Sequence, residues 1–105
     1  IYRLVYNLVE NAIKYNFSDG TVTVTATQQN SQLHLTVEDT GNGIPEELKE
    51  RIFEPFFRLD KSRSRELGGV GLGLALVREI VRVHNGSILV KNNANSGTTF
   101  EVIFP

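Results

Sequence analysis

The chain has 105 residues and a mass of 11.7 kDa, which predicts one compact domain over residues 1–105. It contains no cysteine, which excludes a disulfide scaffold, cysteine-ligated zinc, an iron–sulfur cluster and thiol catalysis. A net charge of -1 argues against a nucleic-acid binder, and no apolar run approaches the roughly 18 residues of a transmembrane helix.

The first element in chain order is a helix over residues 1–16, where apolar residues recur at helical spacing. Leu4, Val9 and Ile13 widen its apolar surface beyond a single stripe, so we expect most of this helix to be buried. Since the chain starts at Ile1 already in the helical pattern, we interpret it as a piece of a longer protein.

Two strands follow, over residues 21–27 and 33–38, because both segments alternate with period two. The polar residues between them predict the turn of a hairpin. The residues that we expect to face inward on the first strand are Val22, Val24 and Ala26.

The second half of the chain continues with a loop, two helices and two strands. The expected segments are a loop over 39–43, a short helix over 45–52, a helix over 72–84, and an antiparallel pair of strands over 87–91 and 98–104. This order predicts an α+β fold, a two-layer α/β sandwich with helices on one face of a mixed, mostly antiparallel sheet.

A polar arc on the first helix is the first candidate site. Its members fall within about 100° of the helix surface and are Arg3, Asn7, Glu10, Asn11 and Lys14. A solvent-facing surface is the ordinary interpretation, but asparagine is a poor helix former and is uncommon on such surfaces. Amide oxygens suit Mg²⁺, which shares its coordination shell with water and phosphate.

The loop over 39–43 is the second candidate site. Asp39 follows a buried strand and can present a carboxylate acceptor, while Gly41 and Gly43 let the backbone approach a flat ligand. Aspartate and glycine are also ordinary turn residues, so the loop alone remains open to both interpretations.

A glycine cluster at residues 68–73 leads directly into the later helix and is a natural place for an anion. It matches neither the dinucleotide fingerprint, which needs glycine at position 74, nor the P-loop, which needs Gly-Lys-Ser/Thr. Basic residues precede it, namely Arg58, Lys61, Arg63 and Arg65. This segment is either a lid over phosphates or a solvated loop.

The two histidines favour structural roles. His34 lies on the outward phase of its strand, and His84 lies at a helix C-terminus, where the helix dipole favours a cation. The sequence contains no Ser–His–Asp pattern and no multi-histidine metal spacing.

In combination and in order, these segments resemble the motifs of bacterial sensor histidine kinases. The resemblance covers an N box at residues 7–15 (NLVENAIKY), a G1 box at 39–43 (DTGNG), an F box at 53–57 (FEPFF), a G2 box at 69–74 (GVGLGL) and a G3-type element at 96–100 (SGTTF). It implies the Bergerat-type ATP-binding fold that these kinases share with gyrase and MutL.

The resemblance also implies roles for single residues. Asp39 would accept a hydrogen bond from the adenine amino group, in a pocket shaped by Gly41, Gly43, Ile44 and Thr98. Asn11, with Asn7, would hold Mg²⁺. The residues implied to contact phosphate or ribose are Lys14, Tyr15, Arg58, Gly69, Val70, Gly71, Leu72, Gly73 and Leu74. Glu10, Asn11 and Lys14 would serve phosphotransfer, and residues 58–70 would form the ATP lid.

The chain departs from the family pattern at two points. Val70 stands where many members have serine or threonine, so no hydroxyl can contact phosphate there. Neither His34 nor His84 has the acidic residue and proline that usually follow the phosphoacceptor histidine. The phosphoacceptor histidine is therefore expected in a dimerisation domain outside residues 1–105. The domain formed by residues 1–105 is expected to be monomeric.

The resemblance implies an ATP-dependent protein-histidine kinase of a two-component system, with a response regulator as partner and no nucleic acid. It implies the cytoplasmic domain of a membrane-anchored sensor. The alternatives are an ATPase of the gyrase or MutL kind, an anti-sigma-factor-type serine kinase, and an interaction module with a degenerate nucleotide site. The ATPase is disfavoured because those enzymes place a glutamate base where this chain has Asn7.

Overall fold

A four-stranded antiparallel sheet forms one layer of the molecule. The computed structural model describes residues 2–57, 72–94 and 96–105. The strands are β1 (Val22–Gln29), β2 (Gln32–Asp39), β3 (Ser87–Asn92) and β4 (Thr98–Phe104), in the spatial order β1-β2-β4-β3. All three pairings are antiparallel, so the described sheet contains no parallel pair.

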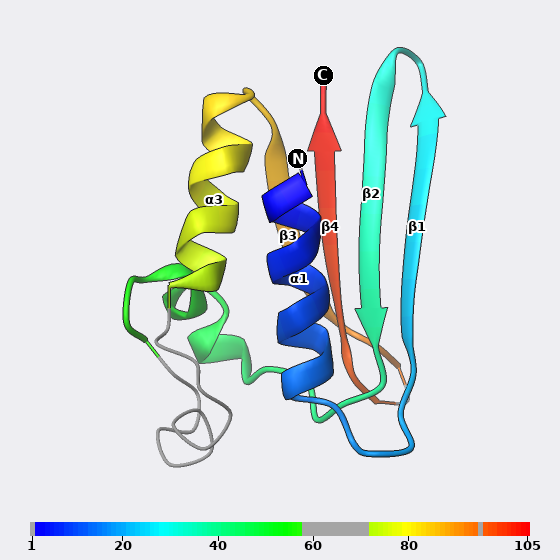
Figure 1. The fold of residues 1–105 in the computed structure, drawn as a ribbon, viewed down its shortest axis with the longest axis vertical. Coiled ribbons are helices and arrows are strands. Elements are labelled where there is room, and N and C mark those ends of the chain that lie inside the picture. The colour runs from blue at the N-terminus through cyan, green and yellow to red at the C-terminus, as the bar shows by residue number, and fades with distance from the viewer. Residues whose placement is uncertain (1, 58–71, 95) are drawn as a thin grey trace.

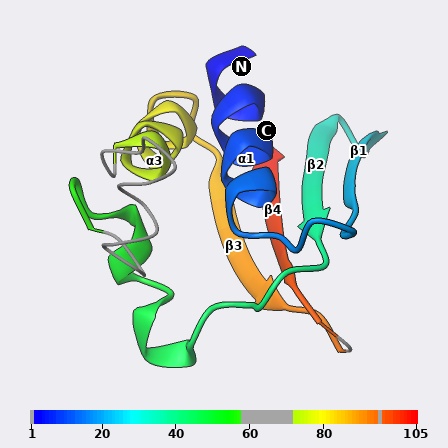
Figure 2. The ribbon, with the colours of Figure 1, turned by 60° about the horizontal axis from the view of Figure 1, so that its bottom comes forward.

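Helices form the second layer. Figures 1 and 2 show α1 (Tyr2–Lys14) and α3 (Gly73–Val83) on the same face of the sheet. This arrangement confirms the predicted α+β two-layer sandwich. The predicted helix over 45–52 is wrong in detail, because that segment forms two short 3-10 turns, η1 (Glu46–Leu48) and η2 (Arg51–Phe53). Its backbone bonds span three residues, as from the Leu48 N–H to the Pro45 carbonyl and from the Glu54 N–H to the Arg51 carbonyl, which is the pattern of short 3-10 pieces.

The core lies between the two layers. Helical spacing places Leu4, Leu8 and Ala12 on one face of α1, where they are buried. Alternate residues of the central strands meet them from the sheet, and the register pairs Val37 with Phe100 across β2 and β4. The remaining buried apolar residues are Leu35, Ile44, Ile52, Phe53, Val77, Val81, Val102 and Phe104. This core holds the ends of α1, β2 and β4 in fixed relation.

The first helix is less buried than its composition predicts. Tyr2 is 80% exposed and Ile13 is 62% exposed, and Tyr6 also faces solvent. Leu4, Leu8 and Ala12 are buried in the core and Val5 and Val9 pack against it in part, whereas no described element covers the opposite side of α1. The expectation of a mostly buried helix is therefore wrong.

The first strand also differs from its expected burial. The register pairs Val24 with Val37 and Ala26 with Leu35, so both side chains share the inner face as predicted. Yet Val24 is 46% exposed and Ala26 is exposed too. The helices lie over the other strands, and β1 extends beyond them at one side of the sheet (Figure 2).

The turn between β1 and β2 fits its sequence. Asn30 and Ser31 both have positive φ, 51° and 67°, between the paired residues Gln29 and Gln32. Two residues with positive φ are the mark of a type I′ hairpin turn, which asparagine tolerates well.

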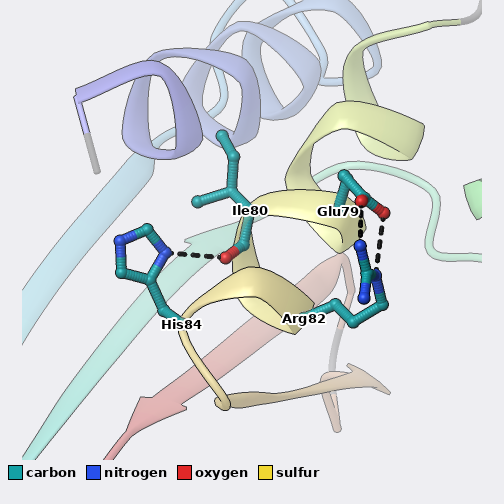
Figure 3. A network of polar contacts seen from close by, with 4 residues as sticks. All are labelled: Glu79, Ile80, Arg82 and His84. Atoms are coloured by element: carbon teal, nitrogen blue, oxygen red, sulfur yellow. Dashed lines mark hydrogen bonds and ion pairs between the residues drawn. The ribbon is translucent and has the colours of Figure 1, made fainter.

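Polar contacts hold the C-terminal end of α3 (Figure 3). His84 donates from Nδ1 to the carbonyl oxygen of Ile80 at 2.9 Å, and its ring meets Phe104 edge-on at 5.8 Å. Glu79 and Arg82 form an exposed ion pair one turn earlier. His84 therefore has the structural role that the sequence predicted.

Three segments that lie far apart in the sequence meet at one end of the sheet. The C-terminal end of α1, the end of β2 and the start of β4 all lie at the lower end of the molecule in Figure 1. This end carries the candidate site.

Candidate functional site

A pocket of about 380 Å³ opens where α1, the loop after β2 and the start of β4 meet. Its walls combine apolar side chains with amides, a carboxylate and a hydroxyl. The lining residues are Asn11, Tyr15, Asn16, Phe17, Asp39, Asn42, Gly43, Ile44, Pro45, Leu48, Thr98 and Phe100. A small, flat ligand with a polar edge fits such a site.

Asp39 is the buried carboxylate of this pocket, with only 5% of its surface exposed. Its Oδ1 accepts hydrogen bonds from the backbone N–H groups of Gly41 at 2.9 Å and Thr98 at 3.1 Å. Among the described residues no donor contacts Oδ2, so this oxygen can accept a hydrogen bond from a ligand.

Burial is the main cause of a raised pKa at Asp39, and the nearby negative charge of Glu38 adds to the rise. The two backbone N–H groups on Oδ1 oppose it, because they stabilise the ionised form. The carboxylate is thus costly to keep charged unless a donor satisfies it.

Apolar side chains form the wall beside Asp39. Ile44 and Phe100 belong to the buried core, and Leu48 packs against it from η1. Their presence next to a single carboxylate suits an aromatic heterocycle that carries an N–H donor on its edge.

Two glycines let the loop after β2 take its shape. A Cβ at Gly41 would lie 2.4 Å from the carbonyl oxygen of Tyr15, so the loop can pack against the end of α1 only without a side chain there. Gly43 has a φ of +82°, which an L side chain rarely adopts. Gly43 lines the pocket, whereas Gly41 is buried behind it.

The segment after α1 is tied to the same loop. Asn16 donates from Nδ2 to the carbonyl oxygen of Thr21 at 2.9 Å, and its Oδ1 accepts from the Thr40 hydroxyl at 3.2 Å. Thr40 in turn accepts from the backbone N–H of Thr21 at 2.9 Å. This network brings Asn16 and Phe17 to the pocket mouth.

The members of the polar arc on α1 do not all face the pocket. Asn11 lines the pocket, but Asn7 donates from Nδ2 to the carbonyl oxygen of Arg3 at 2.7 Å. Lys14 pairs with Glu10 at 3.8 Å, and Glu10 also accepts from the Tyr6 hydroxyl at 3.3 Å. Only one arc member therefore reaches the pocket wall.

The start of α3 lies beside Asn7 rather than in the pocket. A Cβ at Gly73 would lie 3.0 Å from Oδ1 of Asn7, so the two helices approach closely there. Leu72 precedes the helix and is exposed, while Leu74 packs against the core. The other predicted phosphate contacts, Arg58, Gly69, Val70 and Gly71, and the predicted lid over 58–70 lie outside the described residues.

Six lining residues were not predicted from the sequence. They are Asn16, Phe17, Asn42, Pro45, Leu48 and Phe100. Asn42 lies inside the 39–43 motif, and Phe100 follows the inward phase of its strand, so both had a detectable signal. Asn16 and Phe17 had none, because only the tertiary contact with Thr40 brings them to the pocket.

The described residues contain no group of three or more His, Cys, Asp or Glu side chains that could hold a metal ion. A cation at this site would take the amide oxygen of Asn11 together with oxygens of the ligand and water, a donor set that suits Mg²⁺. In the described part of the chain no helix is long and apolar enough to cross a membrane.

Known proteins resemble this chain over nearly its whole length. Residues 1–105 match the family model of the histidine kinase-, DNA gyrase B- and HSP90-like ATPases. The signal transduction histidine-protein kinase ArlS of Staphylococcus aureus strain USA300 is 45% identical over 96 residues, which are 91% of this chain and 21% of ArlS. The chain thus spans about a fifth of the length of the curated relatives it matches.

Solved structures share the same fold. The mycobacterial sensor histidine kinase MprB superposes with a TM-score of 0.84 at 33% identity, over 98% of this chain and 68% of that one. Histidine kinase ThkA, in a complex with the response regulator TrrA, superposes with a TM-score of 0.77 at 34% identity, over 98% of this chain and 27% of that one.

Proposed function

The chain belongs to the family of histidine kinase-, DNA gyrase B- and HSP90-like ATPases, and from this premise we propose that it is the catalytic domain of a two-component sensor histidine kinase. The domain binds ATP with Mg²⁺ and transfers the γ-phosphoryl group to a histidine of the same protein's dimerisation domain. The observation that carries this proposal is Asp39, a buried carboxylate with one oxygen held by the backbone and the other open to a ligand.

The base of ATP is the part of the ligand that this pocket suits best. Adenine is flat and apolar on its faces, which matches Ile44 and the neighbouring apolar wall. Its amino group is a donor, which matches the acceptor Oδ2 of Asp39. Thr98 lines the same pocket, and its hydroxyl would contact the base edge.

The phosphates would extend from the base toward α1. Asn11 would supply an amide oxygen for Mg²⁺ at the pocket wall, and Asn7, which lies outside the pocket lining, would add its Oδ1 as a second donor; a bound cation would offset phosphate charge. Lys14 and Tyr15 would contact phosphate or ribose from the end of the same helix. Arg58 and the backbone at 69–74 complete this proposed phosphate site.

Phosphoryl transfer requires little covalent chemistry from the protein, so positioning and charge carry the rate. The bond between the γ-phosphorus and the bridging oxygen breaks as a phosphorus–nitrogen bond forms, ADP leaves, and the proton of the imidazole passes to a carboxylate or to water. We assign Glu10 to assist this step, because it lies on the polar arc with Asn11 and next to Lys14.

The acceptor histidine and the response regulator are proposed partners. His84 is bonded to the end of its own helix, and His34 lies on the sheet face opposite the core, so neither is presented to the pocket. The ThkA structure in complex with the response regulator TrrA supports a response regulator as the next partner. We place this domain, as a monomer, on the cytoplasmic side of a membrane-anchored sensor.

An ATPase of the gyrase or MutL kind is the weaker candidate. Its water-activating base would have to stand where this chain has Asn7, whose amide donates to the Arg3 carbonyl and cannot take up a proton. A serine kinase would use the same pocket with a different acceptor, and no described residue favours it.

The reaction can be tested by adding radiolabelled ATP and Mg²⁺ to the chain with a separately prepared dimerisation domain of the same protein. We expect label on a histidine of that domain, stable to base and lost in acid. The Asp39→Asn chain is the matched control and should transfer far less label. Label on serine would favour a serine kinase, and bound ATP without any transfer would contradict the proposal.

A further inference from the structure

Two backbone N–H groups hold the Asp39 carboxylate, from Gly41 in the loop after β2 and from Thr98 at the start of β4. The N–H of Thr98 donates to Oδ1 of Asp39 at 3.1 Å, and the carbonyl of the same peptide unit, on Gly97, accepts from the backbone N–H of Asn93 at 2.9 Å. The main chain of Asn93 therefore holds one of the two peptide units that contact the carboxylate.

Asn93 also holds Asp39 from the other side. Its Nδ2 donates to the carbonyl oxygen of Asp39 at 2.9 Å, and its Oδ1 accepts from the Thr99 hydroxyl at 2.5 Å. Since both ends of the side-chain amide are engaged and the residue is half-buried, its rotamer is fixed. The Asn93 side chain thus bonds the main chain of Asp39 and the two residues that flank the Gly97–Thr98 peptide, the Ser96 carbonyl oxygen at 3.4 Å and the Thr99 hydroxyl.

The preceding residue makes an equivalent contact with Ile44. The Ile44 N–H donates to Oδ1 of Asn92 at 2.9 Å, and Nδ2 of Asn92 donates to the Ile44 carbonyl oxygen at 2.9 Å. Such a paired contact needs an acceptor and a donor on one short side chain, which an amide has and a carboxylate lacks. Asn92 therefore holds the apolar wall of the pocket at a residue 48 positions away in the sequence.

We propose that Asn93 and Asn92 are positioning residues for the nucleotide base. Asn93 orients the carboxylate that recognises the adenine amino group, and so sets the preference for adenine. Asn92 holds the wall that contacts any base, and so sets affinity without preference. This inference rests on the proposed function, because it assigns how the same pocket selects its nucleotide.

The test compares ATP with inosine triphosphate, which has a carbonyl in place of the amino group. Dissociation constants are measured by calorimetry for the 105-residue chain and its variants, at a temperature where circular dichroism shows each variant folded. We expect the unchanged chain to prefer ATP by about tenfold or more, as one charge-assisted hydrogen bond provides. Asn93→Ala should reduce this preference to about threefold or less, mainly by weakening ATP.

Asn93→Asp is the second variant, because it keeps the size and the acceptor for Thr99 but removes the donor to Asp39. It should reduce the preference as Asn93→Ala does, and it keeps the test decisive should the alanine variant not fold. Asn92→Ala should weaken both nucleotides by a similar factor and leave the preference unchanged.

Asn85→Ala is the matched control. Asn85 follows α3 with a φ of 58°, so alanine lowers stability there without contacting the pocket. A preference for ATP that stays at its original value in both Asn93 variants, with only a lower melting temperature, would overturn the inference and leave the proposed function intact. A wild-type chain that binds neither nucleotide would contradict the proposed function itself.

Discussion

The two sides of the pocket are built in different ways. The loop over 39–44 is held by the backbone of β4, by the side chains of Asn92 at the end of β3 and Asn93 just after it, and by Asn16 after α1. The polar arc on α1 makes contacts almost entirely within its own helix, from Asn7 to Arg3 and from Lys14 to Glu10. The first side is fixed by contacts between distant segments, and the second by neighbours one turn away.

This difference indicates that the site for the base is preorganised and that the site for the phosphates is not. On the loop side the polar groups already have their partners, and Asp39 keeps one oxygen for a ligand, so little ordering remains on binding. On the α1 side the amide and the ammonium must exchange intrahelical partners for phosphate or Mg²⁺. Binding of the base should therefore depend on the loop side of the pocket, and binding of the phosphates on the cation.

The largest expected effect comes from Gly97→Ala, which breaks the loop side. Gly97 has a φ of +100°, and a Cβ there would lie 1.9 Å from the carbonyl oxygen of Asp39. Strain and overlap together should lower the free energy of unfolding by at least about 2 kcal/mol, measured by urea denaturation.

Gly73→Ala is the matched change on the α1 side of the pocket, because Gly73 of α3 faces Asn7 of α1. Gly73 is helical, and its neighbour is the side-chain amide of Asn7, which can turn away. The free energy of unfolding should change by less than about 1 kcal/mol. Equal losses in the two variants would contradict the contrast between a fixed and an adaptable side.

The next effect is on base recognition, through Asp39→Asn. Asparagine keeps an oxygen for Gly41 and Thr98 but turns an NH₂ group toward the adenine donor. ATP affinity should fall by roughly 10- to 150-fold, as loss of one charge-assisted hydrogen bond implies. Glu38→Gln, on the adjacent exposed residue, is the control in the same titration. Unchanged affinity in Asp39→Asn would remove the adenine assignment.

A smaller effect concerns the cation, through Asn11→Ala. Nucleotide binding in the presence of a chelator should be unchanged, because the base contacts lie on the loop. The gain in affinity on adding Mg²⁺, about tenfold or 1.4 kcal/mol, should disappear. Asn85→Ala should retain that gain. If Mg²⁺ strengthened binding equally in Asn11→Ala, the metal role would be wrong.

The smallest effect is a pH dependence of stability from Asp39. Its pKa is raised in the folded state, chiefly by burial, so the folded chain takes up a proton more readily than the unfolded chain. The contribution of Asp39 to stability is therefore present below its unfolded pKa and is lost as pH rises through its folded pKa. The free energy of unfolding, relative to Asp39→Asn, should rise on acidification. If urea denaturation gave the same difference in unfolding free energy at every pH, or one that fell on acidification, the raised pKa of Asp39 would be contradicted.

The elements of the fold were predictable because their signals are local. Alternation gave both strands of each hairpin, and the 3.6-residue period gave α1 and α3 to within a few residues. Burial was not predictable in the same way. Val24 and Ile13 are apolar residues whose exposure depends on which elements lie above them.

The candidate site was predictable where a polar residue type is unusual for its position and has an evident chemical role. Asp39 at a strand end and Asn11 within an apolar helix both reach the pocket as expected. Asn92 and Asn93 look like ordinary turn residues in the sequence, because their partners at Ile44 and Asp39 are about 50 positions away. Hydrogen bonds of that range leave no local pattern.

The exposed outer strand β1 has a consequence for handling the protein at high concentration. Its sequence, VTVTATQQ, contains no charge, no proline and no glycine, and almost all of it faces solvent. Such segments at a sheet edge are templates for strand pairing between molecules. We therefore expect β1 to promote association at high concentration, and a lysine in place of Thr25, which pairs with Thr36 and not with a pocket residue, should reduce it without contacting the nucleotide.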